Sequence, residues 1–93
     1  MQDNELNTLR AEIDALDEAV IRLLGQRFVA TQKVGELKAS QQLDAVDPAR
    51  EARQAARYAA LAAQHGVSED VVQRVFRVVI DEVVQNHKAL RNN

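Results

Sequence analysis

The chain has 93 residues and a formal net charge of −2, which is typical of one small domain and unlike the basic excess of most nucleic-acid-binding proteins. It contains no cysteine and two histidines, which excludes a disulfide framework and argues against a zinc site. The N-terminal residues are polar and acidic, and no apolar run reaches the length of a membrane span, so we expect a cytoplasmic protein.

Helix-forming residues dominate the composition, so we predict one all-helical domain over residues 1–93. The first helix is predicted over residues 4–40, roughly 54 Å at 1.5 Å per residue. A compact domain of this size has a radius of gyration of about 12 Å, so the rest of the chain is too small to cover this helix, and we expect a homodimer. A narrow seam with alternating spacings of three and four residues follows the helix. Its members are Leu6, Leu9, Ile13, Leu16, Val20, Leu23, Arg27, Ala30, Val34 and Leu37.

Arg27 is the charged member of this otherwise apolar seam. Burying a cation is costly unless an anion meets it. Lys38 follows 11 residues later, about three helical turns, and therefore projects from nearly the same face. The two cations predict a pocket for a small anion. The alternatives are that Arg27 pairs with a carboxylate of the protein or that the seam ends near it.

The second helix is predicted over residues 48–64. Asp47 can cap its first turn, Pro48 suits its first position, and Gly66 suits the residue just after its end. The usual interpretation of such a polar face is that it is solvated, and we accept it for Gln54 and Arg53. It is harder to accept for Asp47, Arg50 and Glu51. The residues of this face are Asp47, Arg50, Glu51, Gln54 and Tyr58.

The third helix is predicted over residues 69–90, with Ser68 as its cap. Its apolar stripe consists of Val72, Val75, Phe76, Val79, Ile80 and Val83. His87 occupies the next position of the stripe, where a histidine is more often a partnered core or helix-end residue than a functional group.

These residues together resemble the all-helical class of chorismate mutases over nearly the whole chain. The matching motifs are Leu9-Arg10, Ile13-Asp14-Ala15-Leu16-Asp17, Leu23-Leu24-x-x-Arg27, Val34-Gly35-x-x-Lys38 and Asp47-x-x-Arg50-Glu51. The resemblance implies an intertwined homodimer of three helices per chain, with Arg10 reaching into the active site of the partner. Arg10 and Arg27 are 17 residues apart and so point about 100° away from one another, which is compatible with service in different sites.

The resemblance implies the Claisen rearrangement of chorismate to prephenate in the shikimate pathway of aromatic amino-acid biosynthesis, which requires no general base, metal or cofactor. The substrate is a dianion, and guanidinium groups bind carboxylates in bidentate fashion, so Arg10 and Arg27 are assigned to its carboxylates. Lys38 is assigned to the ether oxygen, which gains negative charge in the transition state. Glu51 is expected to accept a hydrogen bond from the ring hydroxyl. Supporting residues that close and orient the pocket are Asp47 and Arg50.

The third helix departs from the family pattern. Relatives usually carry a small hydroxyl residue and, four positions later, a glutamine or glutamate that faces the ether oxygen. The corresponding residues here are Val83, which we expect to line the site, and His87. We expect His87 to donate an N–H to the ether oxygen, which imidazole can do in either protonation state. This departure leaves the identity of the substrate open.

Two alternative functions therefore remain open. One is an isochorismate pyruvate lyase or a 4-amino-4-deoxychorismate mutase with the same cationic pocket. The other is a helical dimerisation or regulatory module without activity, against which the charge of Arg27 argues. The sequence leaves open whether a partner enzyme of aromatic biosynthesis binds the chain. Feedback control within this chain is not expected, since it shows no separate domain for phenylalanine or tyrosine.

Overall fold

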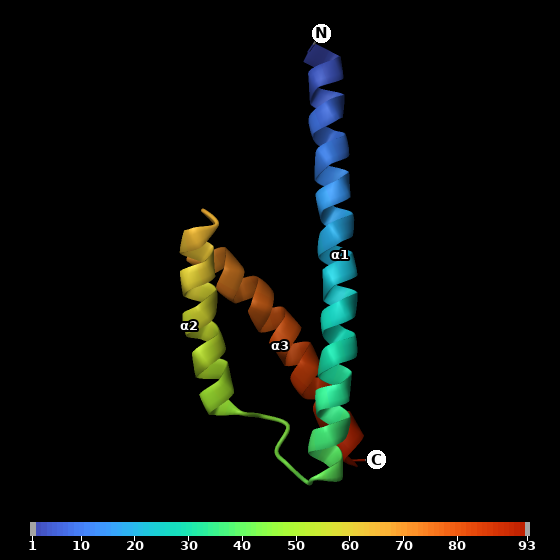
Figure 1. Ribbon diagram of the computed structural model, residues 1–93, viewed down its shortest axis with the longest axis vertical. Coiled ribbons are helices and arrows are strands. Elements are labelled where there is room, and N and C mark those ends of the chain that lie inside the picture. Colours follow the sequence, from blue (N-terminus) through green and yellow to red (C-terminus); the bar gives the residue numbers. More distant parts are fainter. Residues whose placement is uncertain (1, 93) are drawn as a thin grey trace. The chain divides into compact units, whose positions relative to one another are not determined.

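The computed structural model describes residues 2–92, with side chains from Asn4 onward. These residues form three α-helices, α1 (Gln2–Ser40), α2 (Pro48–Gln64) and α3 (Glu69–Asn92), and no strand (Figure 1). The prediction of an all-helical chain with one very long helix is confirmed. Over its described residues, none of the three helices is long and apolar enough to cross a membrane.

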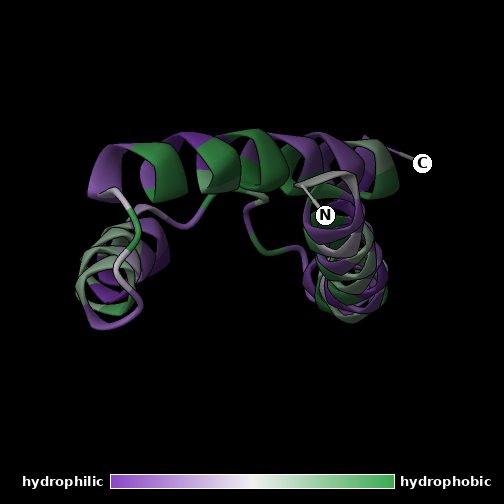
Figure 2. Cartoon of the chain, turned by 90° about the horizontal axis from the view of Figure 1, so that it is seen from above, coloured by the Kyte–Doolittle hydropathy of each residue, from purple (hydrophilic) through white to green (hydrophobic). Residues whose placement is uncertain are grey.

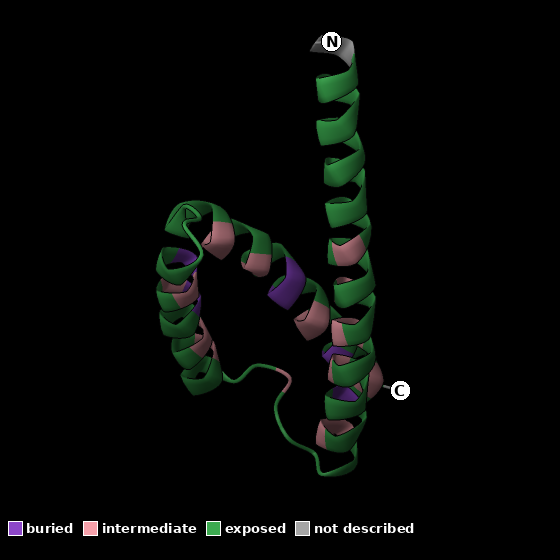
Figure 3. Cartoon of the chain, turned by 45° about the horizontal axis from the view of Figure 1, so that its top comes forward, coloured by how far each residue is buried: buried purple, intermediate pink, exposed green. Residues whose placement is uncertain are grey.

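The chain divides within α1 into two compact units, one ending at Thr31 and the other beginning at Gln32. The first unit is a stretch of α1 in which most of the residues with described side chains are exposed (Figure 3). A single helix cannot bury its own apolar stripe, and Leu16, for example, is 65% exposed. The large apolar side chains left exposed in this unit are Leu6, Leu9, Ile13, Leu16, Val20, Ile21, Leu23 and Val29.

Local capping defines the helices of the second unit. The Asp47 carboxylate accepts a hydrogen bond from the Arg50 backbone N–H at 3.1 Å, and Pro48 follows at the first helical position. After the end of α2, Gly66 has a φ of 67°, in the left-handed region that glycine enters without steric cost. The Ser68 hydroxyl accepts from a backbone N–H in the first turn of α3. These contacts are the ones that the sequence predicts at both helix starts.

The core of the second unit lies where α2 meets α3. Hydrophobic and hydrophilic stretches alternate along α3, as expected for a helix with one buried face (Figure 2). The rings of Tyr58 and Phe76 stack with their centroids 4.2 Å apart. Tyr58, which we assigned to the polar face of the second helix, is therefore a core residue. Val75 differs from its prediction in the opposite way, since it belongs to the predicted apolar stripe but is 52% exposed.

Candidate active site

The predicted site residues fall in both units of the chain. The first unit contributes Arg10, which is exposed, and Arg27, which is half-buried; both lie on α1. The other six belong to the second unit, where α1, the start of α2 and the buried face of α3 carry them. They are Lys38, Asp47, Arg50, Glu51, Val83 and His87.

The first turn of α2 brings three of the predicted residues together. Asp47 uses its side chain to cap the Arg50 N–H and its backbone carbonyl to accept from the Glu51 N–H at 3.0 Å. Acidic groups at a helix start also interact favourably with the helix dipole. The local fold thus presents the Arg50 and Glu51 side chains from adjacent positions of one rigid turn.

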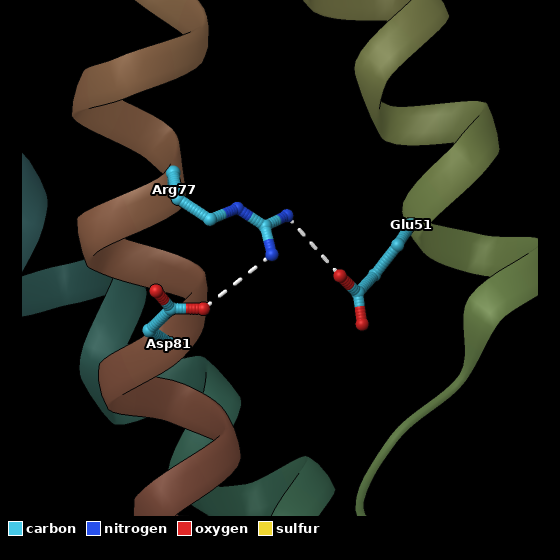
Figure 4. Close-up of polar contacts among 3 residues, drawn as sticks. All are labelled: Glu51, Arg77 and Asp81. Carbon is cyan, nitrogen blue, oxygen red and sulfur yellow. Dashed lines mark hydrogen bonds and ion pairs between the residues drawn. The ribbon is translucent and has the colours of Figure 1, made fainter.

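Glu51 connects α2 to α3 through a residue that the sequence analysis missed. Its Oε1 accepts from Arg77 Nη2 at 3.2 Å, and Arg77 Nη1 donates to Asp81 Oδ1 at 3.4 Å (Figure 4). A partly exposed ion pair contributes about 1 kcal/mol or less, so this link orients side chains more than it holds the helices together. The spacing of four residues between Arg77 and Asp81 predicts an ion pair within one helix. No pattern in the sequence predicts the pairing of Arg77 with Glu51.

Glu51 and Arg77 both border a cavity of about 260 Å³ between α2 and α3. The stacked rings of Tyr58 and Phe76, with Ile80, supply its apolar wall. Charged groups beside an apolar wall are typical of sites for small polar ligands. Glu51 is the one among our predicted site residues that lines this cavity.

Lys38 lies half-buried in the last turn of α1, where a cation is favoured by the helix dipole. Its backbone carbonyl accepts from the Leu43 N–H at 2.8 Å. The Leu43 carbonyl in turn accepts from the Arg91 guanidinium of α3. The connection after Lys38 is therefore held to the end of α3.

His87 is buried, with 5% of its surface exposed, and Val83 is half-buried one turn earlier on α3. The imidazole packs against α1 at Gly35, three residues before Lys38. A β-carbon at position 35 would lie 2.5 Å from His87 Cδ2. Gly35 was noted in the sequence only as part of a motif. The sequence did not reveal that its missing side chain makes room for the imidazole, because this role depends on a contact between distant parts of the chain.

Comparison with known proteins assigns the family. The family model for chorismate mutase type II matches residues 9–88. The chain is 37% identical over 78 residues to the T-protein of Enterobacter agglomerans, an alignment that covers 84% of this chain and 21% of that protein. It is 30% identical over 82 residues to the 4-amino-4-deoxychorismate mutase of Streptomyces venezuelae, covering 88% and 80% of the two chains. It is 28% identical over 87 residues to the chorismate mutase of Methanocaldococcus jannaschii, covering 94% and 84%.

The chain thus spans about a fifth of the T-protein but most of the other two relatives. The matched residues 9–88 make up far more than half of its length. This match confirms the predicted all-helical class and the predicted isomerase type of enzyme. The chain belongs to the chorismate mutase type II family.

Proposed function

We propose that this chain rearranges chorismate to prephenate. The observation that carries the proposal is the family match over residues 9–88, an interval that contains all eight predicted site residues. In the reaction the ether C–O bond breaks while a new C–C bond forms within the same molecule. Binding and electrostatic stabilisation therefore suffice, and the residues need not transfer a proton.

Arg10 and Arg27 are proposed to bind the two carboxylates of the substrate. Arginine suits this task because its planar fork can hold a carboxylate through two hydrogen bonds and so restrict its orientation. Holding both carboxylates favours the chair-like shape in which the reacting carbons meet.

Lys38 and His87 are proposed to donate to the ether oxygen. Their positions support this role, since His87 packs against α1 one turn from Lys38. Negative charge develops on this oxygen as the C–O bond breaks, so donors placed there stabilise the transition state more than the bound substrate. Val83, half-buried one turn before His87, is proposed to supply an apolar wall.

Glu51 is proposed to accept a hydrogen bond from the ring hydroxyl. Its position supports the assignment because it borders the cavity between α2 and α3. Asp47 and Arg50 are proposed to orient this end of the site, as the capped first turn of α2 carries both Arg50 and Glu51.

A homodimer with shared sites is part of the proposal, as is a single domain over residues 1–93. The exposed stripe of the first unit supports it, because soluble monomers rarely leave so many large apolar side chains uncovered along one helix. A second copy of the chain offers the same stripe, and a self-complementary contact is the usual arrangement of a dimer with twofold symmetry. Arg10 would then serve the site of the partner chain.

The test is incubation of the purified protein with chorismate and, separately, with isochorismate. Prephenate from chorismate, without pyruvate or salicylate from isochorismate, is the expected result. Pyruvate and salicylate from isochorismate with no prephenate from chorismate would identify a lyase. A folded protein that changes neither of these compounds nor 4-amino-4-deoxychorismate would identify a module without this activity.

One second candidate has a specific observation in its favour. The Streptomyces venezuelae relative is named a 4-amino-4-deoxychorismate mutase, and the alignment covers 80% of it. That compound carries an amine where chorismate has the ring hydroxyl, so the same carboxylate-binding residues would serve it. The group facing Glu51 is the chemical difference between the two substrates.

A further inference from the structure

The contact between Glu51 and Arg77 bears on whether the site prefers the ring hydroxyl of chorismate or the ring amine of 4-amino-4-deoxychorismate. The two residues are 26 positions apart, and their side chains join the first turn of α2 to the middle of α3. Figure 4 shows the Arg77 guanidinium between the carboxylates of Glu51 and Asp81, with one nitrogen directed to each. Asp81 thereby restrains the orientation of Arg77, and Arg77 restrains that of Glu51.

This restraint leaves Glu51 able to accept from a ligand. The contact with Arg77 engages Oε1, and a carboxylate has about four lone-pair sites over its two oxygens. The Glu51 side chain is 25% exposed and borders the cavity together with Arg77. A ligand in that cavity would therefore meet a carboxylate whose negative charge is partly balanced by an adjacent cation.

Such a pair favours a hydroxyl over an amine. A hydroxyl is neutral, so donating to Glu51 brings no charge beside the guanidinium. An aliphatic amine is mostly protonated at neutral pH, and its positive charge would be repelled by Arg77 while being attracted by Glu51. A free carboxylate would hold the ammonium more strongly than the hydroxyl, and the pairing with Arg77 diminishes that advantage.

We infer that Arg77 is a positioning residue that acts through Glu51 and makes the site select a ring hydroxyl over a ring amine. The inference rests on the proposed function and narrows it to chorismate as the preferred substrate. It concerns specificity, since Arg77 is not assigned a contact with the reacting atoms.

The test compares kcat/KM for chorismate and for 4-amino-4-deoxychorismate in the wild-type protein, in three arginine variants, and in Glu51→Gln with and without Arg77→Gln. Arg77→Gln removes the charge, and Arg77→Lys retains it. Arg74→Gln is the matched control, because Arg74 lies one turn away beside the same cavity but pairs with Asp70 at 2.9 Å. All three should fold, since each changes a side chain that is more than half exposed.

We expect the wild-type protein to prefer chorismate and Arg77→Gln to shift the ratio of the two kcat/KM values at least tenfold toward the amine, the order expected for removing one nearby charge. Arg77→Lys should retain most of the wild-type ratio, and Arg74→Gln should change it less than about twofold, because Arg74 pairs with Asp70 and not with Glu51. In a Glu51→Gln background Arg77→Gln should shift the ratio less than it does in the wild-type protein, because only the direct repulsion between Arg77 and the amine then remains to be removed.

An active protein whose ratio is the same in Arg77→Gln as in the wild type would overturn the inference and leave the mutase function standing. The same holds for an equal shift in Arg74→Gln, or for a wild-type preference for the amine. A wild-type protein that converts neither substrate would instead refute the proposed function, and the inference with it.

Discussion

Gly35 on α1 and His87 on α3 pack so closely that a β-carbon at position 35 would lie 2.5 Å from His87 Cδ2 and 3.0 Å from Nε2. Glycine is normally unfavourable inside a helix by about 1 kcal/mol relative to alanine. Here its missing side chain provides the space that the imidazole fills. Leu90 Cδ1 would also lie 2.9 Å from the added atom, so two side chains would have to move to admit it.

Replacing Gly35 by alanine should therefore destabilise the protein. The gain in helix propensity is about 1 kcal/mol, whereas forcing a methyl group into a packed contact costs about 1–3 kcal/mol. The control is Gly25→Ala, because nothing lies within 4 Å of a β-carbon there. Urea unfolding should show lower stability for Gly35→Ala and a gain of about 0.5–1 kcal/mol for Gly25→Ala. Equal stabilisation by both substitutions would contradict the close packing of His87.

Substitution of His87 tests its proposed donation to the ether oxygen. His87→Leu has similar bulk but no donor and should lower kcat by about 10²-fold, the loss typical of removing one donor to a developing oxyanion. His87→Gln retains an N–H donor and should keep most of the activity. Circular dichroism on each variant establishes that the helices are intact. Wild-type kcat in a folded His87→Leu protein would leave Lys38 as the sole proposed donor.

Mixed dimers test the sharing of sites between chains. Arg10→Ala and Lys38→Ala proteins should each be nearly inactive, because every site then lacks one binding residue. When the two are unfolded and refolded together in equal amounts, half of the dimers are mixed and each has one intact site. Activity should therefore recover to about a quarter of the wild-type value. Refolding either variant alone is the control, and no recovery in verified mixed dimers would place Arg10 outside the partner's site.

Two substitutions of Asp47 distinguish its role as a helix cap from a role in binding the substrate. Asp47→Ala should lower stability by about 1 kcal/mol through loss of the hydrogen bond to the Arg50 N–H. Asp47→Asn can still accept that bond, so its stability and most of its kcat/KM should be retained. Thermal unfolding and kinetics on the same preparations decide the matter. A stable Asp47→Asn protein with greatly reduced activity would show that the charge itself contacts the substrate.

Much of the fold could be predicted because its signals are local. Asp47-Pro48, Ser68 and Gly66 define the helix starts and the end of α2 through hydrogen bonds to residues only a few positions away. The spacing of three and four residues in the first helix depends only on helix periodicity. For the same reason the motifs that resemble chorismate mutases, each within one helix or at its start, were sufficient to indicate the family.

The tertiary structure decided what depends on contacts between helices. Tyr58 has a polar hydroxyl and fits the polar face of α2, yet its ring is buried because Phe76 lies opposite it. Arg77 has a local partner in Asp81, and only the packing of α2 against α3 brings it to Glu51 as well. In the sequence, Gly35 is only a residue that disfavours a helix. In the structure, His87, 52 residues later, occupies the space that a side chain at position 35 would need. Periodicity identifies which face of a helix is buried, but the residue opposite each position follows from how the helices pack, and that packing gives these three residues their surroundings.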